Sequence, residues 1–167
     1  QPMMEVNHVY FRLFGDIIWQ HSHETADFCA AIFESQGQDS FDGFLLGLLH
    51  DIGKIVAFSV LVDSIKDSDP SLMPGSRRFK AIIEHTSRQA TFFVGKQWDL
   101  PPNLMIAFRD HSVANKPQEM SDAGKALHWA NLLSELCLLV KADMCEQEGI
   151  VARLEQAFAD LNCMNRN

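Results

Sequence analysis

The sequence predicts an all-α protein, a compact bundle of about six to eight helices. Apolar residues recur every three or four positions through most of the chain, which is the spacing of amphipathic helices. No stretch shows the strict apolar–polar alternation that is typical of a half-buried strand. Turn-forming residues interrupt the helical pattern at residues 35–37, 67–75 and 112–121.

The first half of the chain contains four expected helices. The first two share an apolar face that ends at Ser35-Gln36-Gly37. The next two are strongly apolar and are separated just before Gly53, a residue that favours a helix end. The expected ranges are residues 5–19, 21–35, 41–50 and 52–65.

Four more helices are expected in the second half. The longest loop, from Asp67 to Gly75, precedes the first of them and could cover or open a site. Pro101 and Pro102 follow Asp99, and proline suits the first positions of a helix. The expected ranges are residues 77–98, 101–112, 122–145 and 149–162.

The adjacent His50 and Asp51 form the most informative motif. Neighbours on a regular helix point about 100° apart, so both side chains can bind one ion only where the helix ends. An imidazole nitrogen and a carboxylate oxygen suit divalent ions such as Fe, Mn, Zn or Mg. Lys54 adds a positive charge that could bind a phosphate. The pair therefore predicts half of a metal site.

Other histidines are the candidates for the remaining ligands. His21 lies on the stripe of Ile17 and Phe28, whereas His23 shares a polar face. His111 lies on an apolar stripe, and His85 is also expected to point inward, although its neighbours are mixed. A single histidine on such a stripe is more often a hydrogen-bonded core residue, as His8 and His128 are interpreted to be. The combination favours a site, because His21, the His50–Asp51 pair, His85 and His111 lie near apolar stripes in separate helices.

These motifs, in this order and spacing, resemble the HD superfamily, and most of all its HDOD branch. They are Trp19-Gln20-His21-Ser22, Gly47-Leu48-Leu49-His50-Asp51-Ile52-Gly53-Lys54, Glu84-His85, Trp98-Asp99-Leu100-Pro101 and the helix ending at His111. The similarity runs from about Trp19 to Leu139, and the catalytic relatives are the HD-GYP cyclic-dinucleotide phosphodiesterases. It implies one HD/HDOD-like helical domain over residues 1–167 that corresponds to the second half of an HDOD unit. The opening Gln1-Pro2 lacks an initiator Met, which favours a piece of a longer protein.

The resemblance also implies the ligands of a first metal. They would be His21, His50, Asp51 and a carboxylate on a later helix, where this chain has Asn131. An amide keeps an oxygen donor but removes a negative charge, so a dication would bind more weakly.

The HD-GYP relatives bind a second metal through the bridging Asp, a further His and a His-His doublet. Asp51 and His85 of this chain match the first two positions. Here the doublet is His111-Ser112, so each metal position lacks one ligand.

Asn131 lies on an inward stripe with Leu127 and Ser134, so its amide needs partners with or without a metal. One interpretation is a hydrogen-bonded remnant of the ancestral ligand. The other is that Glu135 or His128, each about one turn away, replaces the lost ligand.

Composition narrows the classes of partner and compartment. The formal charge of −8 argues against a general nucleic-acid surface, and Arg77-Arg78 with Lys80 is the only basic cluster. The four cysteines show no Cys-x-x-Cys spacing, and we identify neither a secretory segment nor an apolar run long enough to cross a bilayer. We therefore expect a cytoplasmic protein with no membrane partner.

Two functions follow from the motifs and the resemblance. The favoured one is a regulatory signal-transduction module with a degenerate site and, at most, a weakly bound Fe, Mn, Mg or Zn ion. Its partner would be a signalling protein or a small phosphorylated ligand. The alternative is a metal-dependent phosphohydrolase or cyclic-dinucleotide phosphodiesterase, in which the ion activates water and Lys54 steadies the phosphate.

Overall fold

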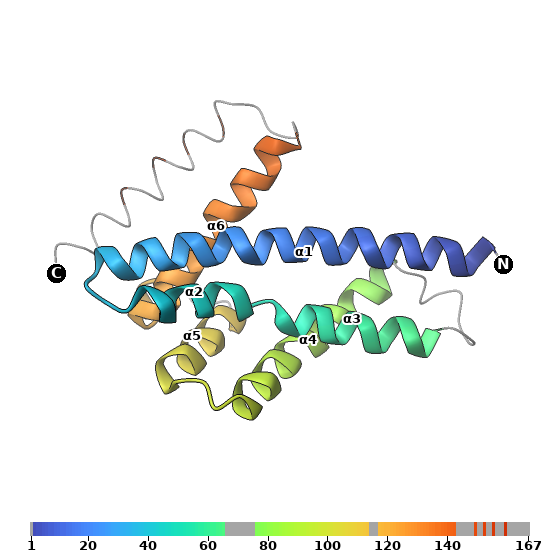
Figure 1. The fold of residues 1–167 in the computed structure, drawn as a ribbon, viewed down its shortest axis with the longest axis horizontal. Coiled ribbons are helices and arrows are strands. Elements are labelled where there is room, and N and C mark those ends of the chain that lie inside the picture. Colours follow the sequence, from blue (N-terminus) through green and yellow to red (C-terminus); the bar gives the residue numbers. More distant parts are fainter. Residues whose placement is uncertain are drawn as a thin grey trace. The chain divides into compact units, whose positions relative to one another are not determined.

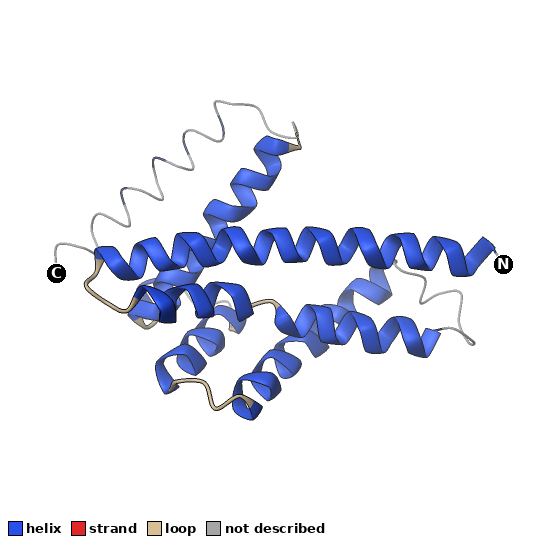
Figure 2. Cartoon of the chain, viewed as in Figure 1, coloured by secondary structure: helices blue, strands red, loops and turns tan. Residues whose placement is uncertain are grey.

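A computed structural model describes residues 2–65, 76–113 and 117–142, with four isolated positions beyond them (149, 152, 155 and 159). Within these residues the chain forms α-helices and one short 3-10 helix and no strand (Figures 1 and 2), which confirms the all-α prediction. The elements are α1 (Pro2–Ser35), α2 (Ser40–Leu49), α3 (Ile52–Ile65), α4 (Arg77–Gln97), α5 (Pro102–Ser112), η2 (Pro117–Glu119) and α6 (Asp122–Lys141). The helix expected over 149–162 falls almost entirely outside the described residues.

One expected helix boundary is wrong. We expected a break between residues 19 and 21, but α1 continues from Pro2 to Ser35. Neither glycine nor proline occurs between Trp19 and Ser22, so nothing in the local sequence stops the helix. The Thr25 hydroxyl donates a hydrogen bond to the His21 carbonyl at 2.8 Å within the helix. His21 is therefore carried by a continuous helix.

The contacts of the chain group into two compact units. The first comprises residues 1–20 with 49–101, and the second comprises residues 21–48 with 102–167. The expectation of one domain over residues 1–167 stays a prediction.

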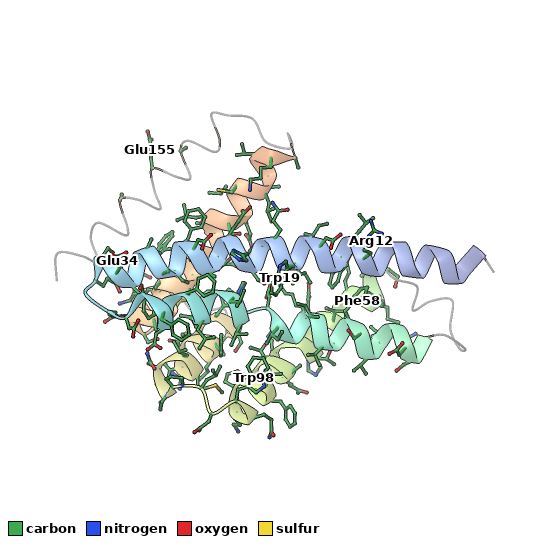
Figure 3. The ribbon with its side chains drawn as sticks, viewed as in Figure 1. Arg12, Trp19, Glu34, Phe58, Trp98 and Glu155 are labelled. Atoms are coloured by element: carbon green, nitrogen blue, oxygen red, sulfur yellow. The ribbon has the colours of Figure 1, made fainter. Side chains whose placement is uncertain are left out.

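In the first unit, aromatic rings join three helices. Phe58 of α3 stacks on Phe14 of α1, with ring centroids 4.2 Å apart, and meets the edge of Phe79 of α4 at 5.5 Å. Ala57 and Ile83 complete this buried cluster. Phe58 is labelled in Figure 3, where it projects from α3. Burying a phenyl ring contributes roughly 1.5–3 kcal/mol, so this cluster is a major source of stability in the unit.

The packing of α3 on α4 depends on Gly53. A Cβ atom at this position would lie 1.9 Å from the carbonyl oxygen of Ser87 and 2.4 Å from Oγ1 of Thr91. Real Cβ atoms do not approach other atoms so closely, so only glycine fits this backbone contact. The facing stripe of α4 is correspondingly small, with Ser87, Thr91 and Gly95 all buried.

Thr91 also anchors the turn that precedes α3. Its Oγ1 accepts the Gly53 N–H at 3.1 Å and donates to the His50 carbonyl at 3.4 Å. One hydroxyl thus satisfies an N–H at the start of α3 and a carbonyl just past the end of α2, two groups that helix termini leave unpaired. The His50–Asp51 turn is held from both sides by this contact.

In the second unit, all four helices contribute large buried side chains. They are Phe33 from α1, Leu46 from α2, Leu104 from α5, and Leu127 and Leu136 from α6. This shared core fixes the helices that carry His21 and Asn131 against one another, since both lie in this unit.

The start of α6 is tied to α5 by Asp110. The Asp110 carboxylate accepts the backbone N–H and the hydroxyl of Ser121, at 2.8 and 2.7 Å. Ser121 in turn caps α6 by accepting the Gly124 N–H at 3.1 Å. Burial alone would raise the pKa of Asp110, but the Ser121 hydrogen bonds and the Arg109 charge lower it overall. The ionised Asp110 carboxylate therefore fixes the start of α6 against α5.

One expectation from composition needs correction. The segment Ser40–Leu61, with a mean hydropathy of 1.8, is long and apolar enough to cross a membrane by length and composition. In this fold the segment is divided into α2 and the first part of α3. Of its most apolar 18-residue stretch, 44% is buried inside the protein. A core helix of a soluble protein can be equally long and apolar, so length and composition alone are weak evidence for a membrane span.

Replacing Gly53 by alanine tests the close approach of α3 and α4. The added methyl group would force the helices apart, so we expect Gly53→Ala to lower the free energy of unfolding by about 1–3 kcal/mol or more. Gly15→Ala is the matched control, because a Cβ at Gly15 meets nothing within 4 Å. It should stabilise α1 by roughly 0.5–1 kcal/mol. Equal effects of the two substitutions in urea unfolding would contradict this packing.

Candidate metal centre

The turn between α2 and α3 carries the His50–Asp51 pair. Because α2 ends at Leu49 and α3 begins at Ile52, both residues lie outside regular helix, as the motif predicts. Both side chains are buried, and His50 Nε2 lies 3.5 Å from Asp51 Oδ2. At this separation an imidazole nitrogen and a carboxylate oxygen can bind the same ion.

Lys54 neutralises the buried carboxylate. Its Nζ donates to Asp51 Oδ2 at 2.7 Å, and the Asp51 side chain is only 6% exposed. A buried carboxylate is costly without a partner, so this ion pair supports the motif when no metal is bound. A dication would compete with the ammonium group for the same oxygen.

His21 is held by two side chains of α6. Ser134 Oγ lies 2.9 Å from His21 Nδ1 and 3.1 Å from the His21 carbonyl oxygen. On the other edge of the ring, Asn131 Oδ1 lies 3.1 Å from Nε2. The inward positions expected for Asn131 and Ser134 are therefore observed, and Ser134 is completely buried.

Glu135 sets the orientation of the Asn131 amide. The Asn131 Nδ2 group donates to Glu135 Oε1 at 2.8 Å, which directs Oδ1 toward His21. Glu135 is exposed and pairs with the amide, so it orients Asn131 in this structure. This contact shows that the Asn131 amide is hydrogen-bonded within the protein, and its interpretation as the remnant of a ligand stays a prediction.

The proton positions around His21 have two consistent arrangements. In one, Nε2–H donates to Asn131 and the Ser134 hydroxyl donates to Nδ1. In the other, Nδ1–H donates to Ser134, whose hydroxyl donates to the His21 carbonyl, and the Nε2 lone pair faces Asn131 Oδ1, which is favourable only when a cation binds both atoms. The second arrangement is the one that a metal-binding histidine requires, with its other ring nitrogen held by a polar neighbour.

Three of the predicted ligands come together. The ligand atoms of His21, His50 and Asp51 all lie within 4.8 Å of one another, and all three residues are buried. In the described part of the chain, no other group of three His, Cys, Asp or Glu side chains meets this distance. Asn131 Oδ1, at 3.1 Å from Nε2 of His21, adds a neutral oxygen donor. Neighbouring ligands around an octahedral ion with bonds of about 2.1 Å are roughly 3.0 Å apart, so this pair suits one ion.

Two further predicted ligands do not belong to this cluster. His85 is exposed, so its expected inward orientation is wrong. It lies two residues from both Ile83 and Ser87, which form the buried stripe of α4, and a two-residue step turns it to the other side. His111 is half-buried in the last turn of α5. The neighbouring Ser112 donates its hydroxyl to the Arg109 carbonyl at 2.8 Å.

His128 also has an ordinary structural environment. It is half-buried, and its ring meets the edge of Trp129 with centroids 5.0 Å apart. Burial lowers the pKa of His128, partly offset by the charge of Glu135.

Sequence reasoning missed the residues that orient the ligands. Ser134 was expected only to face inward, and Thr91 was not singled out. Both are small hydroxyl residues on inward-facing helical stripes, and this pattern could have identified them. A single hydroxyl is too common at buried helix contacts to indicate a role without its partner.

Comparison with protein families supports the resemblance. A model of the HDOD domain matches residues 13–114. The chain belongs to the HDOD family. The HDOD match includes the positions of His21, His50 and Asp51 but ends before α6, so Asn131 lies outside it. No curated protein and no solved structure matches the chain.

Replacing Lys54 by methionine tests the competition between ammonium group and metal. Without metal, Lys54→Met leaves Asp51 buried without its cation, so we expect a loss of about 1–3 kcal/mol of stability. Mn²⁺ should restore much of this loss, because the ion takes over the role of the ammonium group. The readout is the melting temperature with and without Mn²⁺.

Lys125→Met is the matched control. Lys125 forms the same i, i+3 pair with Asp122, at 3.3 Å, but the Asp122 side chain is 73% exposed. An exposed pair contributes roughly 0–1 kcal/mol, so this variant should be nearly neutral and should respond to Mn²⁺ as the parent does. A Lys54→Met protein that is destabilised and indifferent to Mn²⁺ would contradict the metal centre.

Proposed function

We propose that this protein is a regulatory signal-transduction module of HDOD type with a degenerate metal centre. In this proposal, His21, His50 and Asp51 bind a divalent ion weakly, with Asn131 as a neutral fourth donor. The module acts by binding a signalling partner or a small phosphorylated ligand instead of turning over a substrate.

The observation that carries this proposal is the Asn131 amide. Its oxygen lies beside the metal-facing nitrogen of His21, and its nitrogen is held by Glu135. The donor set then contains two imidazoles, one amide oxygen and only one carboxylate, which Lys54 already neutralises. Hard divalent ions bind more weakly as anionic ligands are lost. The ion would be readily exchanged, which suits a sensor better than an enzyme that must retain its metal.

A phosphohydrolase or cyclic-dinucleotide phosphodiesterase is the second candidate. The specific observation in its favour is the position of Lys54, whose Nζ lies at Asp51. An ion that takes the Asp51 carboxylate would release this ammonium group to bind a phosphate. Turnover of cyclic dinucleotides at about 1 per second or faster, abolished in His50→Ala, would support this candidate and contradict the regulatory proposal.

Asn131→Asp restores the anionic ligand that the family resemblance implies. We expect this variant to bind Mn²⁺ at least about tenfold more tightly than the parent, a difference of about 1.4 kcal/mol. Without metal it should be less stable by about 1–3 kcal/mol, because the new carboxylate loses the hydrogen bond to Glu135 and repels it. Isothermal titration with Mn²⁺ and urea unfolding measure the two effects.

Asn103→Asp is the control for the added charge. Asn103 is exposed in the first turn of α5, so its replacement makes the same chemical change away from the cluster. It should leave the Mn²⁺ affinity unchanged. If Asn131→Asp is destabilised and binds Mn²⁺ no better than Asn103→Asp, Asn131 does not occupy a metal position.

A further inference from the structure

The charge of α4 is opposite to that of the chain as a whole. The helix has five Lys and Arg side chains and one carboxylate, Glu84, although the formal net charge of the chain is −8. Outside α4 the chain carries 9 of its 14 basic side chains but 21 of its 22 carboxylates. The helix is therefore the main concentration of positive charge on an acidic protein.

Part of this charge lies on the face of α4 that points away from its buried stripe. Arg88, Gln89, Phe92, Phe93 and Lys96 recur at helical spacing and line an open depression of about 450 Å³. The buried stripe, which includes Ser87 and Thr91, lies on the other side of the helix. We call these five lining residues the outer face of α4.

Two cations of the outer face pair with no carboxylate in the described part of the chain. Arg88 and Lys96 are exposed, and neither forms an ion pair with a carboxylate among the described residues. Glu84 is the only carboxylate of α4 and lies one turn before Arg88. Among the described residues, Glu84 forms no salt bridge with Arg88. The face thus presents positive charge to solvent.

The outer face also exposes an aromatic ring between the cations. Phe93 is 65% exposed, and Phe92 beside it is half-buried. Aromatic residues with arginine at an exposed surface are enriched at protein–protein interfaces, where the ring provides the apolar contact. Charge and ring together describe a surface for a ligand that is both acidic and apolar.

We propose that the outer face of α4 docks an acidic peptide segment of a partner protein, with an apolar side chain against Phe93. Arg88 and Lys96 are eight residues apart, which is about 12 Å along the helix axis. Carboxylates eight residues apart on a helical peptide, or three to four apart on an extended one, match this distance. Nucleic acid is a poorer match, because the rest of the chain is strongly acidic and would repel it. This inference rests on the proposed partner-binding role and names the chemistry of that partner.

The test uses a fluorescein-labelled synthetic 16-residue peptide of Glu, Leu and Ala, with two Glu residues eight positions apart and Leu between them. Binding is followed by fluorescence anisotropy. We expect Arg88→Glu and Lys96→Glu each to weaken binding by about tenfold, because each turns an attraction into a repulsion. Phe93→Ser should weaken it by about fivefold, whereas a peptide with Ser for Leu should bind the parent and Phe93→Ser equally.

Arg12→Glu is the matched control for charge reversal. Arg12 is an exposed cation of α1, labelled in Figure 3. This variant should bind the peptide within about twofold of the parent. Equal binding by the parent and Arg88→Glu would overturn the proposal, as would no binding by the parent. Equally strong binding of a single-stranded oligonucleotide, lost in Arg88→Glu, would also overturn it in favour of a general anion surface.

A second measurement separates this inference from the metal centre. The melting temperature of Arg88→Glu should respond to Mn²⁺ as that of the parent does, since the outer face excludes the ligand cluster. Peptide binding without any Mn²⁺ response would leave the docking face standing and contradict the metal centre. A Mn²⁺ response without peptide binding would support the metal centre and contradict the docking face.

Discussion

The close contact between Gly53 and α4 is the physical constraint on which the His50–Asp51 turn depends. A Cβ at Gly53 would collide with the Ser87 carbonyl, so α3 and α4 can meet at this point only through a glycine. The close approach brings the Thr91 hydroxyl to Gly53 and His50, where it holds the turn from both sides. The glycine of the motif is therefore needed for packing as well as for ending a helix. Loss of this contact would release the turn that orients His50 and Asp51.

Several polar side chains of the cluster are paired with other side chains of the protein. Asp51 has Lys54 as its cation, and the Asn131 amide is shared between His21 and Glu135. Ser134 can act as donor or acceptor toward His21, so one tautomer satisfies the metal-free protein and the other exposes a lone pair. An ion bound at the proposed centre would compete with Lys54 for the Asp51 carboxylate.

The sequence predicted the helical architecture and the His50–Asp51 turn well, because both depend on local patterns. Periodicity determines helices, and an apolar run ending before a glycine determines where a helix stops. The inward position of His21 was predicted correctly, although Ile17, which was expected on the same inward stripe, is 59% exposed. The continuous α1 was missed, because two helices were expected over residues 5–19 and 21–35 although no helix-breaking residue occurs between Trp19 and Ser22.

The remaining errors concern contacts between segments that are far apart in sequence. The orientation of His85 could not be settled from a mixed stripe, and the packing of α4 on α3 turned it to solvent. The partnership of Asn131 with Glu135 is local, but its role depends on His21, 110 positions away along the chain. Thr91 and Ser134 act only through such distant partners. Spacing in a single sequence does not contain this information.

Elemental analysis of protein purified without chelator tests the central claim most directly, with His50→Ala purified in parallel. We expect substoichiometric Fe, Mn, Mg or Zn in the parent, reduced in His50→Ala, because His50 is one of the three clustered ligands. The same metal content in both proteins would contradict a metal centre at this turn. A full equivalent of tightly held metal in the parent would contradict a degenerate one.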